Sequence, residues 1–402
     1  MAQISGEIRE ISISLAKPLP FLIPLFLTII LLSRNKISFN NRWLKIILLS
    51  FFVWFVAYTV KIMRFGGDYW LLGVAYLAVT IIYAYIHITV FGKDLFLIFE
   101  KIMVWLSVIS LFFYTFQLLA PNAANSFFSM FPDTNERGYN FLYLYKYFYT
   151  ISDRAFYLGL TRNSGCSWEP GRFSMMLIFA IYVNCLRYGK ITLNKNFIIL
   201  SIALLTTFST TGYVLFLVLW LIFSVRKISL TKVMFIIVLF IPVSYYIYNI
   251  NFVSSKFEEQ IETSNDLNTY IRYQSYRDDD EDFLALERIP SIGIEYQNWL
   301  KDPIVGYGHW GNSWFHEEVT ASAKTCGGLM QVISTYGIIL GIFFYVCLFV
   351  SSRNISKLFG GRSRSFGLFV ITLLASVSYP VFGVIFLTSM WFAGLFLHKI
   401  NS

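Results

Sequence analysis

Long apolar runs recur along almost the whole chain. A helix needs about 20 predominantly apolar residues, each adding 1.5 Å, to cross the hydrocarbon core of a bilayer. Such runs predict an all-α, polytopic membrane protein of about 11–12 transmembrane helices. Two of the stretches, 196–225 and 365–398, are each expected to split into a tight helical hairpin. The runs lie near 17–33, 44–60, 70–92, 95–119, 171–189, 196–208, 210–225, 230–250, 327–352, 365–379 and 381–398.

The composition argues against a soluble protein. Hydrophobic residues make up 56% of the chain and charged residues 14%, whereas about a quarter of the residues in a soluble domain are charged. The formal net charge is +9, but the basic residues form no continuous stripe and accompany no recognition motif. We therefore expect no nucleic-acid partner.

The charges between the apolar runs predict an orientation. Four gaps contain bases and no acids, and all four fall on one side of the membrane when the runs are counted. The positive-inside rule makes that side the cytoplasm. The long gaps 120–170 and 251–326 are then external, and the whole chain, 1–402, is expected to form one transmembrane domain. The bases concerned are Arg34, Lys36, Arg42, Lys45, Arg187, Lys190, Lys195, Arg226, Lys227, Lys232, Arg353, Lys357, Arg362 and Arg364.

The stretch 251–326 is the largest polar excursion. It holds fourteen of the 23 acids and six of the 32 bases, a net charge of −8, which leaves a net charge of +17 on the rest of the chain. Loops longer than about 15 residues without regular structure are usually functional or disordered. A functional role is therefore expected for this acidic loop, which contains Arg272, Arg277 and Arg288.

The other external stretch, 120–170, is rich in aromatic residues between Tyr139 and Tyr149. Tyrosine favours the headgroup level of a bilayer, so an interfacial helix is expected here. An alternative is that some of these rings stack on sugars.

Charged residues flank the apolar run that begins near residue 171. Pro170 and Gly171 suit a turn and the opening of a helix. Glu169 and Arg172 are then placed at the membrane surface, where ionisable residues are candidate functional groups. An ordinary helix cap with a Glu/Arg surface pair is the structural alternative.

Glycine and histidine mark the second half of the acidic loop. Gly306 and Gly308, which follow Trp299 and Pro303, allow close backbone approach or a positive φ. His309 and His316 lie just beyond.

Cysteine usage indicates no metal site, since no C-x-x-C pair occurs. Cys185 and Cys347 fall in apolar runs and are expected to be buried. Cys166 and Cys326 are both placed outside, where a bridge between them remains open.

Taken together, these motifs resemble the O-antigen polymerase and ligase superfamily. The likeness rests on Arg162, on Glu169-Pro170-Gly171 before a span, on Ser209-Thr-Thr-Gly212 in a tight hairpin, and on Trp299…Pro303-Ile-x-Gly306-x-Gly308 after loop arginines. Within the superfamily the chain looks most like a Wzy-type polysaccharide polymerase. The residues around His309 and His316 do not match the ligase pattern cleanly.

The resemblance implies a GT-C-like fold and a glycosyltransferase in the bacterial inner membrane that needs no metal and no cofactor. Such an enzyme joins undecaprenyl-diphosphate-linked repeat units on the periplasmic face, and the partners implied are membrane lipid and a chain-length regulator. Arg162, Arg172 and the loop arginines would bind substrate, while Glu169, His309 or His316 would act as the base. The alternatives are an O-antigen ligase acting on lipid A-core and a flippase of lipid-linked oligosaccharide.

Overall fold

A computed structural model gives the fold of the chain, which is mostly helical. It describes residues 28–31, 33–34, 41–65, 71–131, 138–148, 156–157, 160–167, 169–224, 283–285, 288–306, 322–324, 328–360, 364–379, 381–383 and 385–399.

Helices occupy the predicted spans throughout these ranges. Arg42–Arg64, Asp94–Leu119 and Gly328–Leu358 are long and apolar enough to cross a membrane, which supports the prediction of an α-helical membrane protein. The run 230–250 and all but the last residues of the run 17–33 lie outside the described residues. The helices that match predicted spans are α3 (Arg42–Phe65), α4 (Leu71–Phe91), α5 (Asp94–Leu119), α7 (Pro170–Tyr188), α8 (Lys195–Thr206), α9 (Thr210–Ser224), α15 (Gly328–Leu358), α16 (Gly367–Ser378) and α17 (Ile385–Phe392).

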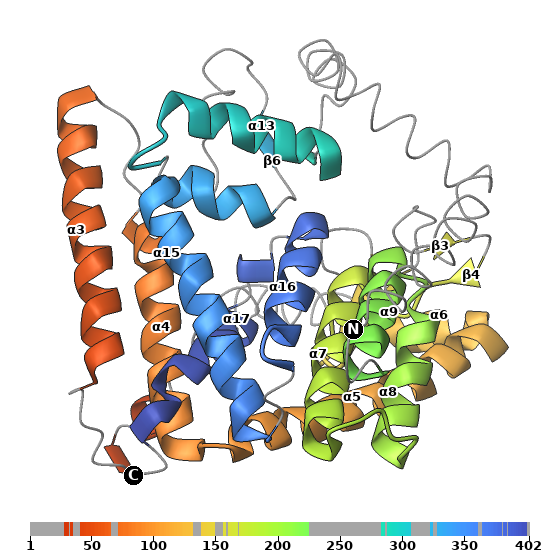
Figure 1. The fold of residues 1–402 in the computed structure, drawn as a ribbon. Helices are drawn as coiled ribbons and strands as arrows, with labels where there is room; N and C mark the ends of the chain where they lie inside the picture. The colour runs from red at the N-terminus through yellow and green to blue at the C-terminus, as the bar shows by residue number, and fades with distance from the viewer. Residues whose placement is uncertain are drawn as a thin grey trace, which may run out of the picture.

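Two groups of helices share the core. In one, α7 packs against α5, α8 and α9, and in the other, α4 packs against α17 and the 3-10 segment η3 (Ala393–Lys399), which also contacts α15. Helix α16 lies between them, against α9 and α15 (Figure 1). Nearly every side chain of α7 is buried, including Phe173, Phe179 and Tyr182. Helix α7 is therefore the central helix of its group.

Both predicted breaks occur where expected. Helix α8 ends at Thr206 and α9 begins at Thr210, and Phe208 between them has a φ of 44°. In the second stretch the chain leaves α16 at Ser378, passes through the 3-10 segment η2 (Val381–Gly383) and enters α17.

Helix α15 contains a sharp kink. Gly337 has φ 74° and ψ 170°, outside the helical region. The turns before the kink lie across the ends of the upright helices, under α13 (Arg288–Lys301), and the turns after it run down through the bundle (Figure 1).

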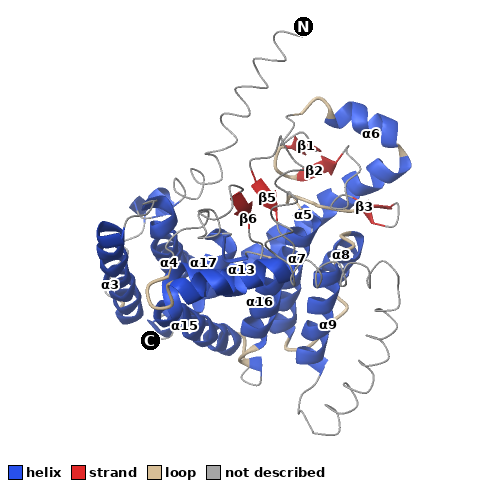
Figure 2. Cartoon of the chain, turned by 90° about the horizontal axis from the view of Figure 1, so that it is seen from above, coloured by secondary structure: helices blue, strands red, loops and turns tan. Residues whose placement is uncertain are grey.

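Short strands add to the helical fold, although an all-α chain was predicted. β1 (Gly138–Phe141) pairs antiparallel with β2 (Tyr145–Phe148), β3 (Phe156–Tyr157) pairs antiparallel with β4 (Leu160–Thr161), and β5 (Phe283–Ala285) pairs parallel with β6 (Ser322–Lys324). The β1–β2 hairpin lies beside the end of α5 and the short helix α6 (Pro121–Phe128) (Figure 2).

The interfacial helix predicted for the aromatic stretch is therefore wrong. Within the hairpin, the rings pack mainly on other rings: Tyr147 stacks on Phe128 at 4.8 Å between centroids, and Tyr145 lies 5.5 Å from Phe113. Tyr145, Tyr147 and Phe148 are buried. The alternation of aromatic residues at every second position is a strand pattern, and a buried aromatic cluster also removes these three rings from any contact with sugars. Tyr149 lies outside the described residues.

Candidate functional site

A polar cluster surrounds the first turn of α7. We call it the helix-entry cluster: Arg162, Asn163, Glu169, Gly171, Ser174, Ser209, Thr211 and Tyr379. Its residues come from the segment before α7, from α7 itself, from the α8–α9 turn, from the first turn of α9 and from the residue that follows α16.

The segment before α7 is fastened to the α8–α9 turn. The Nε of Arg162 donates to the carbonyl of Thr207 at 3.1 Å. The backbone N–H of Asn163 donates to the carbonyl of Thr206 at 2.9 Å, and its side-chain amide donates to Ser110 of α5 at 2.8 Å. These bonds place the guanidinium of Arg162 beside the turn and orient its plane.

Glu169 immediately precedes α7 but does not cap it with its side chain. Its backbone is extended, with φ −147° and ψ 136°, and its carboxylate accepts no hydrogen bond from the first turn of the helix. Instead the hydroxyl of Tyr379 donates to Oε1 of Glu169 at 3.1 Å. The alternative of an ordinary side-chain cap is therefore wrong.

The absence of a side chain at Gly171 leaves room for the Tyr379 ring that contacts Glu169. A Cβ on Gly171 would lie 1.7 Å from the Tyr379 hydroxyl oxygen and 2.2 Å from its Cζ. Any side chain at residue 171 would thus displace the tyrosine. Pro170 is therefore a favourable first residue for α7, and Gly171 leaves space for the phenol of Tyr379.

Hydroxyl groups join α7 to the α8–α9 turn, and they join α9 to the end of α16. Ser174 donates to Ser209 at 3.1 Å, and Ser209 accepts the N–H of Gly212 at 3.1 Å, which caps the start of α9. Thr211 donates to Ser378 at 3.0 Å, one residue before Tyr379. The Ser209-Thr-Thr-Gly212 motif therefore lies against the first turn of α7, which Glu169 directly precedes.

A second junction binds the loop after α13 to the kink of α15. A Cβ on Gly306 (φ 75°) would lie 2.3 Å from the backbone nitrogen of Gly337, so the expected close approach at Gly306 is confirmed. The N–H of Ile338 donates to the carbonyl of Pro303 at 2.8 Å. From α3, Trp54 donates to the carbonyl of Val305 at 2.7 Å.

Charged groups reinforce this junction, and the sequence analysis missed them. Lys61 of α3 pairs with Asp302 and donates to the carbonyl of Gly306 at 2.8 Å. Ser334 donates to the buried carboxylate of Glu295 on α13. Asp302 and Glu295 were counted only as members of the acidic loop, although Asp302 directly precedes the Pro303–Gly306 motif.

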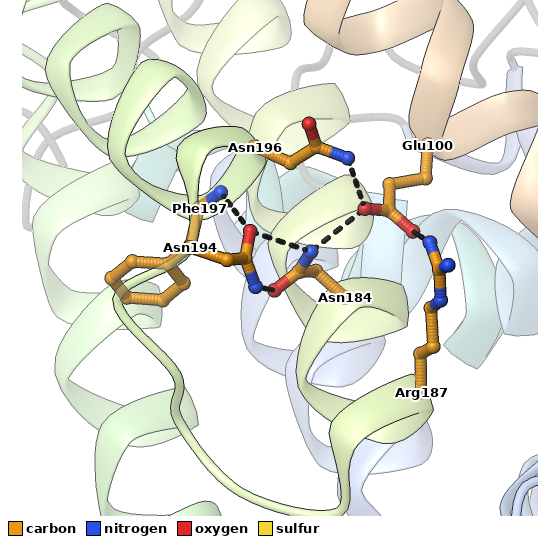
Figure 3. Close-up of polar contacts among 6 residues, drawn as sticks. All are labelled: Glu100, Asn184, Arg187, Asn194, Asn196 and Phe197. Atoms are coloured by element: carbon orange, nitrogen blue, oxygen red, sulfur yellow. Dashed lines mark hydrogen bonds and ion pairs between the residues drawn. The ribbon is translucent and has the colours of Figure 1, made fainter.

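A third polar cluster lies at the opposite end of α7 (Figure 3). Oε1 of the fully buried Glu100 accepts hydrogen bonds from Asn184 at 2.7 Å and Asn196 at 2.9 Å. Arg187 lies 3.9 Å from Oε2, and Asn194 bonds with Asn184. Residues 170 and 184 of α7 are about 21 Å apart along the helix axis, so this cluster is separate from the helix-entry cluster.

The remaining predicted site residues are placed only in part. Arg172 is half-buried in the first turn of α7. Arg288 is the first residue of α13, and only its backbone is described. Arg272, Arg277, Gly308, His309 and His316 lie outside the described residues.

The cysteines follow their predicted burial where they are described. Cys185 and Cys347 are buried, and Cys166 is a free thiol. Burial raises the pKa of the Cys166 thiol to about 11. Its suggested partner, Cys326, lies outside the described residues. Within the described ranges, no three His, Cys, Asp or Glu side chains form a group that could hold a metal ion.

Comparison with known proteins adds no assignment: no protein-family model matches this chain, and no curated protein sequence matches it.

Proposed function

We propose that the chain is a glycosyltransferase that polymerises lipid-linked oligosaccharide repeat units. The donor would be a glycan on undecaprenyl diphosphate, and the acceptor would be the sugar of a second lipid-linked unit. The fold would be GT-C-like, with the helix-entry cluster on the periplasmic face of a bacterial inner membrane. The resemblance in the motifs motivates this proposal.

One observation supports it most: Arg162 and Glu169 are held at the same end of α7 by partners from distant segments. The Thr207 carbonyl accepts from Arg162, and the Tyr379 hydroxyl donates to Glu169. A cation and a carboxylate at the end of an apolar bundle suit a reaction whose substrates have a lipid tail and a charged head. The two groups belong to one motif in sequence and to one cluster in space.

Arginine suits the leaving group of this reaction. As the glycosidic bond breaks, negative charge builds on the diphosphate, and a planar guanidinium can stabilise it with paired N–H donors. Arg162 and Arg172 are the candidates in the described cluster. The loop arginines Arg272, Arg277 and Arg288 remain candidates for the same role.

A carboxylate suits the acceptor side. The hydroxyl of the acceptor sugar attacks the anomeric carbon of the donor, the bond to the diphosphate oxygen breaks, and the hydroxyl proton passes to a base. Glu169 fits that base because its carboxylate is not engaged as a helix cap and is oriented by Tyr379. His309 and His316 remain alternative candidates. The step requires neither a metal nor a redox cofactor.

The test is complementation of a strain that lacks the gene, read as surface glycan on a gel. If the strain without the gene loses long glycan chains but keeps single repeat units on its surface, the result supports a polymerase. Loss of all attached glycan would identify a ligase instead, and accumulation of the lipid-linked unit on the cytoplasmic side would identify a flippase.

Point variants then test the residues. Arg162→Ala, Arg272→Ala and Arg277→Ala should each shorten the glycan ladder at an unchanged amount of folded protein, whereas Lys101→Ala, on the exposed side of α5, should not. Full-length ladders from all three arginine variants would refute the diphosphate-binding role.

A further inference from the structure

The turn of the β1–β2 hairpin exposes two apolar side chains. Leu142 is 66% exposed and Tyr143 is 45% exposed. Both have a positive φ, 48° and 60°, a conformation that is unfavourable for residues other than glycine. Asn and Gly are the usual residues in such turns. Although Asn140 supports the turn by accepting the N–H of Tyr143 at 3.0 Å, turn chemistry does not account for a leucine and a tyrosine at these positions.

The hairpin lies alongside α5 rather than beyond its end. The ring of Phe141, the residue before the turn, is 4.9 Å from the ring of Phe113. Phe113 lies six residues before the end of α5 at Leu119, which is about 9 Å along the helix axis. The turn therefore stands level with the last part of a helix that is long and apolar enough to cross a membrane.

The exposed face of α5 in this region is apolar. Trp105, Phe112 and Leu119 are 70%, 67% and 80% exposed, and they alternate at helical spacing with the buried Ser107, Ser110 and Tyr114 on the other face. The chain carries no charged residue from 102 to 131. An uncharged apolar stripe on a membrane-crossing helix is the surface that lipid covers.

We propose that the turn Leu142–Tyr143 inserts into the bilayer beside α5, at the boundary between acyl chains and headgroups. Leucine suits the acyl side of this boundary, and tyrosine the headgroup level. Met130, which is 72% exposed, adds to this surface, because the ring of its neighbour Phe131 lies 4.8 Å from Phe141. The partner is membrane lipid, and the surface continues the lipid-facing stripe of α5.

Insertion would set the depth of the segment that leads into α7. The N–H of Lys146 on β2 donates to the carbonyl of Gly165 at 2.9 Å, and the hydroxyl of Tyr114 on α5 donates to the carbonyl of Thr161 at 2.8 Å. Arg162 lies between these two attachment points. The hairpin thus holds Arg162 near the level of lipid headgroups, whatever reaction the protein performs.

The test is fluorescence quenching of the full chain in nanodiscs of phosphatidylethanolamine and phosphatidylglycerol. The four native cysteines are replaced by alanine, and a fluorophore is attached at Leu142→Cys or, as the matched control, at Asn125→Cys on the exposed face of α6. Lipids with a nitroxide high on the acyl chain should quench the label at 142 at least twofold more than the label at 125. Aqueous iodide should show the reverse order.

Equal quenching of the two labels by iodide, with no preference for the nitroxide lipid at 142, would overturn the proposal. Protection at 142 from both quenchers, together with a covalent dimer after photocrosslinking, would also overturn it, in favour of a second copy. If the cysteine-free background does not fold, a photoreactive phenylalanine analogue at 142 in the otherwise native chain replaces the label. A mass increase by attached phospholipid then supports insertion, and a product without lipid contradicts it.

Discussion

The hydroxyl of Tyr379 donates a 3.1 Å hydrogen bond to Oε1 of Glu169, and the two residues are 210 positions apart in the chain. This contact joins the start of α7 to the end of α16. It fixes the direction of the one carboxylate in the helix-entry cluster, and so it provides the sharpest test of the proposed base.

Tyr379→Phe should lower polymer synthesis about tenfold, since one hydrogen bond to a carboxylate is worth roughly 1.5 kcal/mol. The phenyl ring still fills its place beside Gly171, so the amount of folded protein should be unchanged. Glu169→Gln should lower synthesis further, because an amide cannot take the proton. The measurement is the rate of undecaprenyl diphosphate release by purified enzyme, over a range of pH.

Tyr345→Phe is the matched control, because it also removes one hydroxyl, which donates to the Leu329 carbonyl at 2.6 Å outside the cluster. It should leave the pH profile unchanged. A Glu169→Gln enzyme with native rate at every pH would show that Glu169 is not the base.

Gly171→Ala should abolish activity and lower the yield of folded protein, because the new Cβ would lie 1.7 Å from the Tyr379 hydroxyl. The double variant Gly171→Ala with Tyr379→Leu should recover the folded yield but not the activity. Gly293→Ala in α13, where a Cβ would meet nothing within 4 Å, serves as the control. Yield is measured by size-exclusion chromatography in detergent, and a native yield of Gly171→Ala would contradict the packing described.

Glu100→Ala should destabilise the fold by about 3 kcal/mol, because the buried amide of Asn184 and the half-buried amide of Asn196 would lose their acceptor. Glu100→Gln should cost less, since its amide oxygen can still accept from both asparagines. Thermal unfolding in detergent measures the difference. Lys101→Gln, at the exposed neighbouring residue, is the control and should unfold at the native temperature. An equal loss of stability in Glu100→Ala and Glu100→Gln would argue that charge rather than hydrogen bonding matters at residue 100.

Cys166 should alkylate slowly at neutral pH. Burial raises its pKa from 9.0 to about 11, so the reactive thiolate is about 100-fold scarcer than for an ordinary cysteine. The alkylation rate should rise about tenfold per pH unit until pH approaches that pKa. Peptide-resolved mass spectrometry after iodoacetamide treatment measures the alkylation rate. Ser126→Cys, on the exposed face of α6, provides the reference thiol. Equal alkylation rates of the two thiols at pH 7.5 would show that Cys166 is accessible.

The local sequence pattern predicted the helices but not the contacts between residues that are distant in the chain. Apolar run length predicted α5 and α15, and the Ser209–Gly212 motif marked the α8–α9 break, because span length and turn chemistry are properties of neighbouring residues. The pairing of Glu169 with Tyr379, and of Glu295 with Ser334, depends on how distant helices pack, and no local signal encodes it. The hairpin was missed for another reason: preference of tyrosine for the membrane interface was given more weight than the period-two spacing of Tyr139, Phe141, Tyr145 and Tyr147.

The kink at Gly337 also determines how well α15 matches the thickness of a bilayer. As one straight rod, its 31 residues would measure about 46 Å, well beyond a hydrocarbon core of about 30 Å. The part after the kink, from Ile338 to Leu358, measures about 31 Å. One glycine therefore divides a helix that is longer than the hydrocarbon core and leaves a straight segment whose length matches that core.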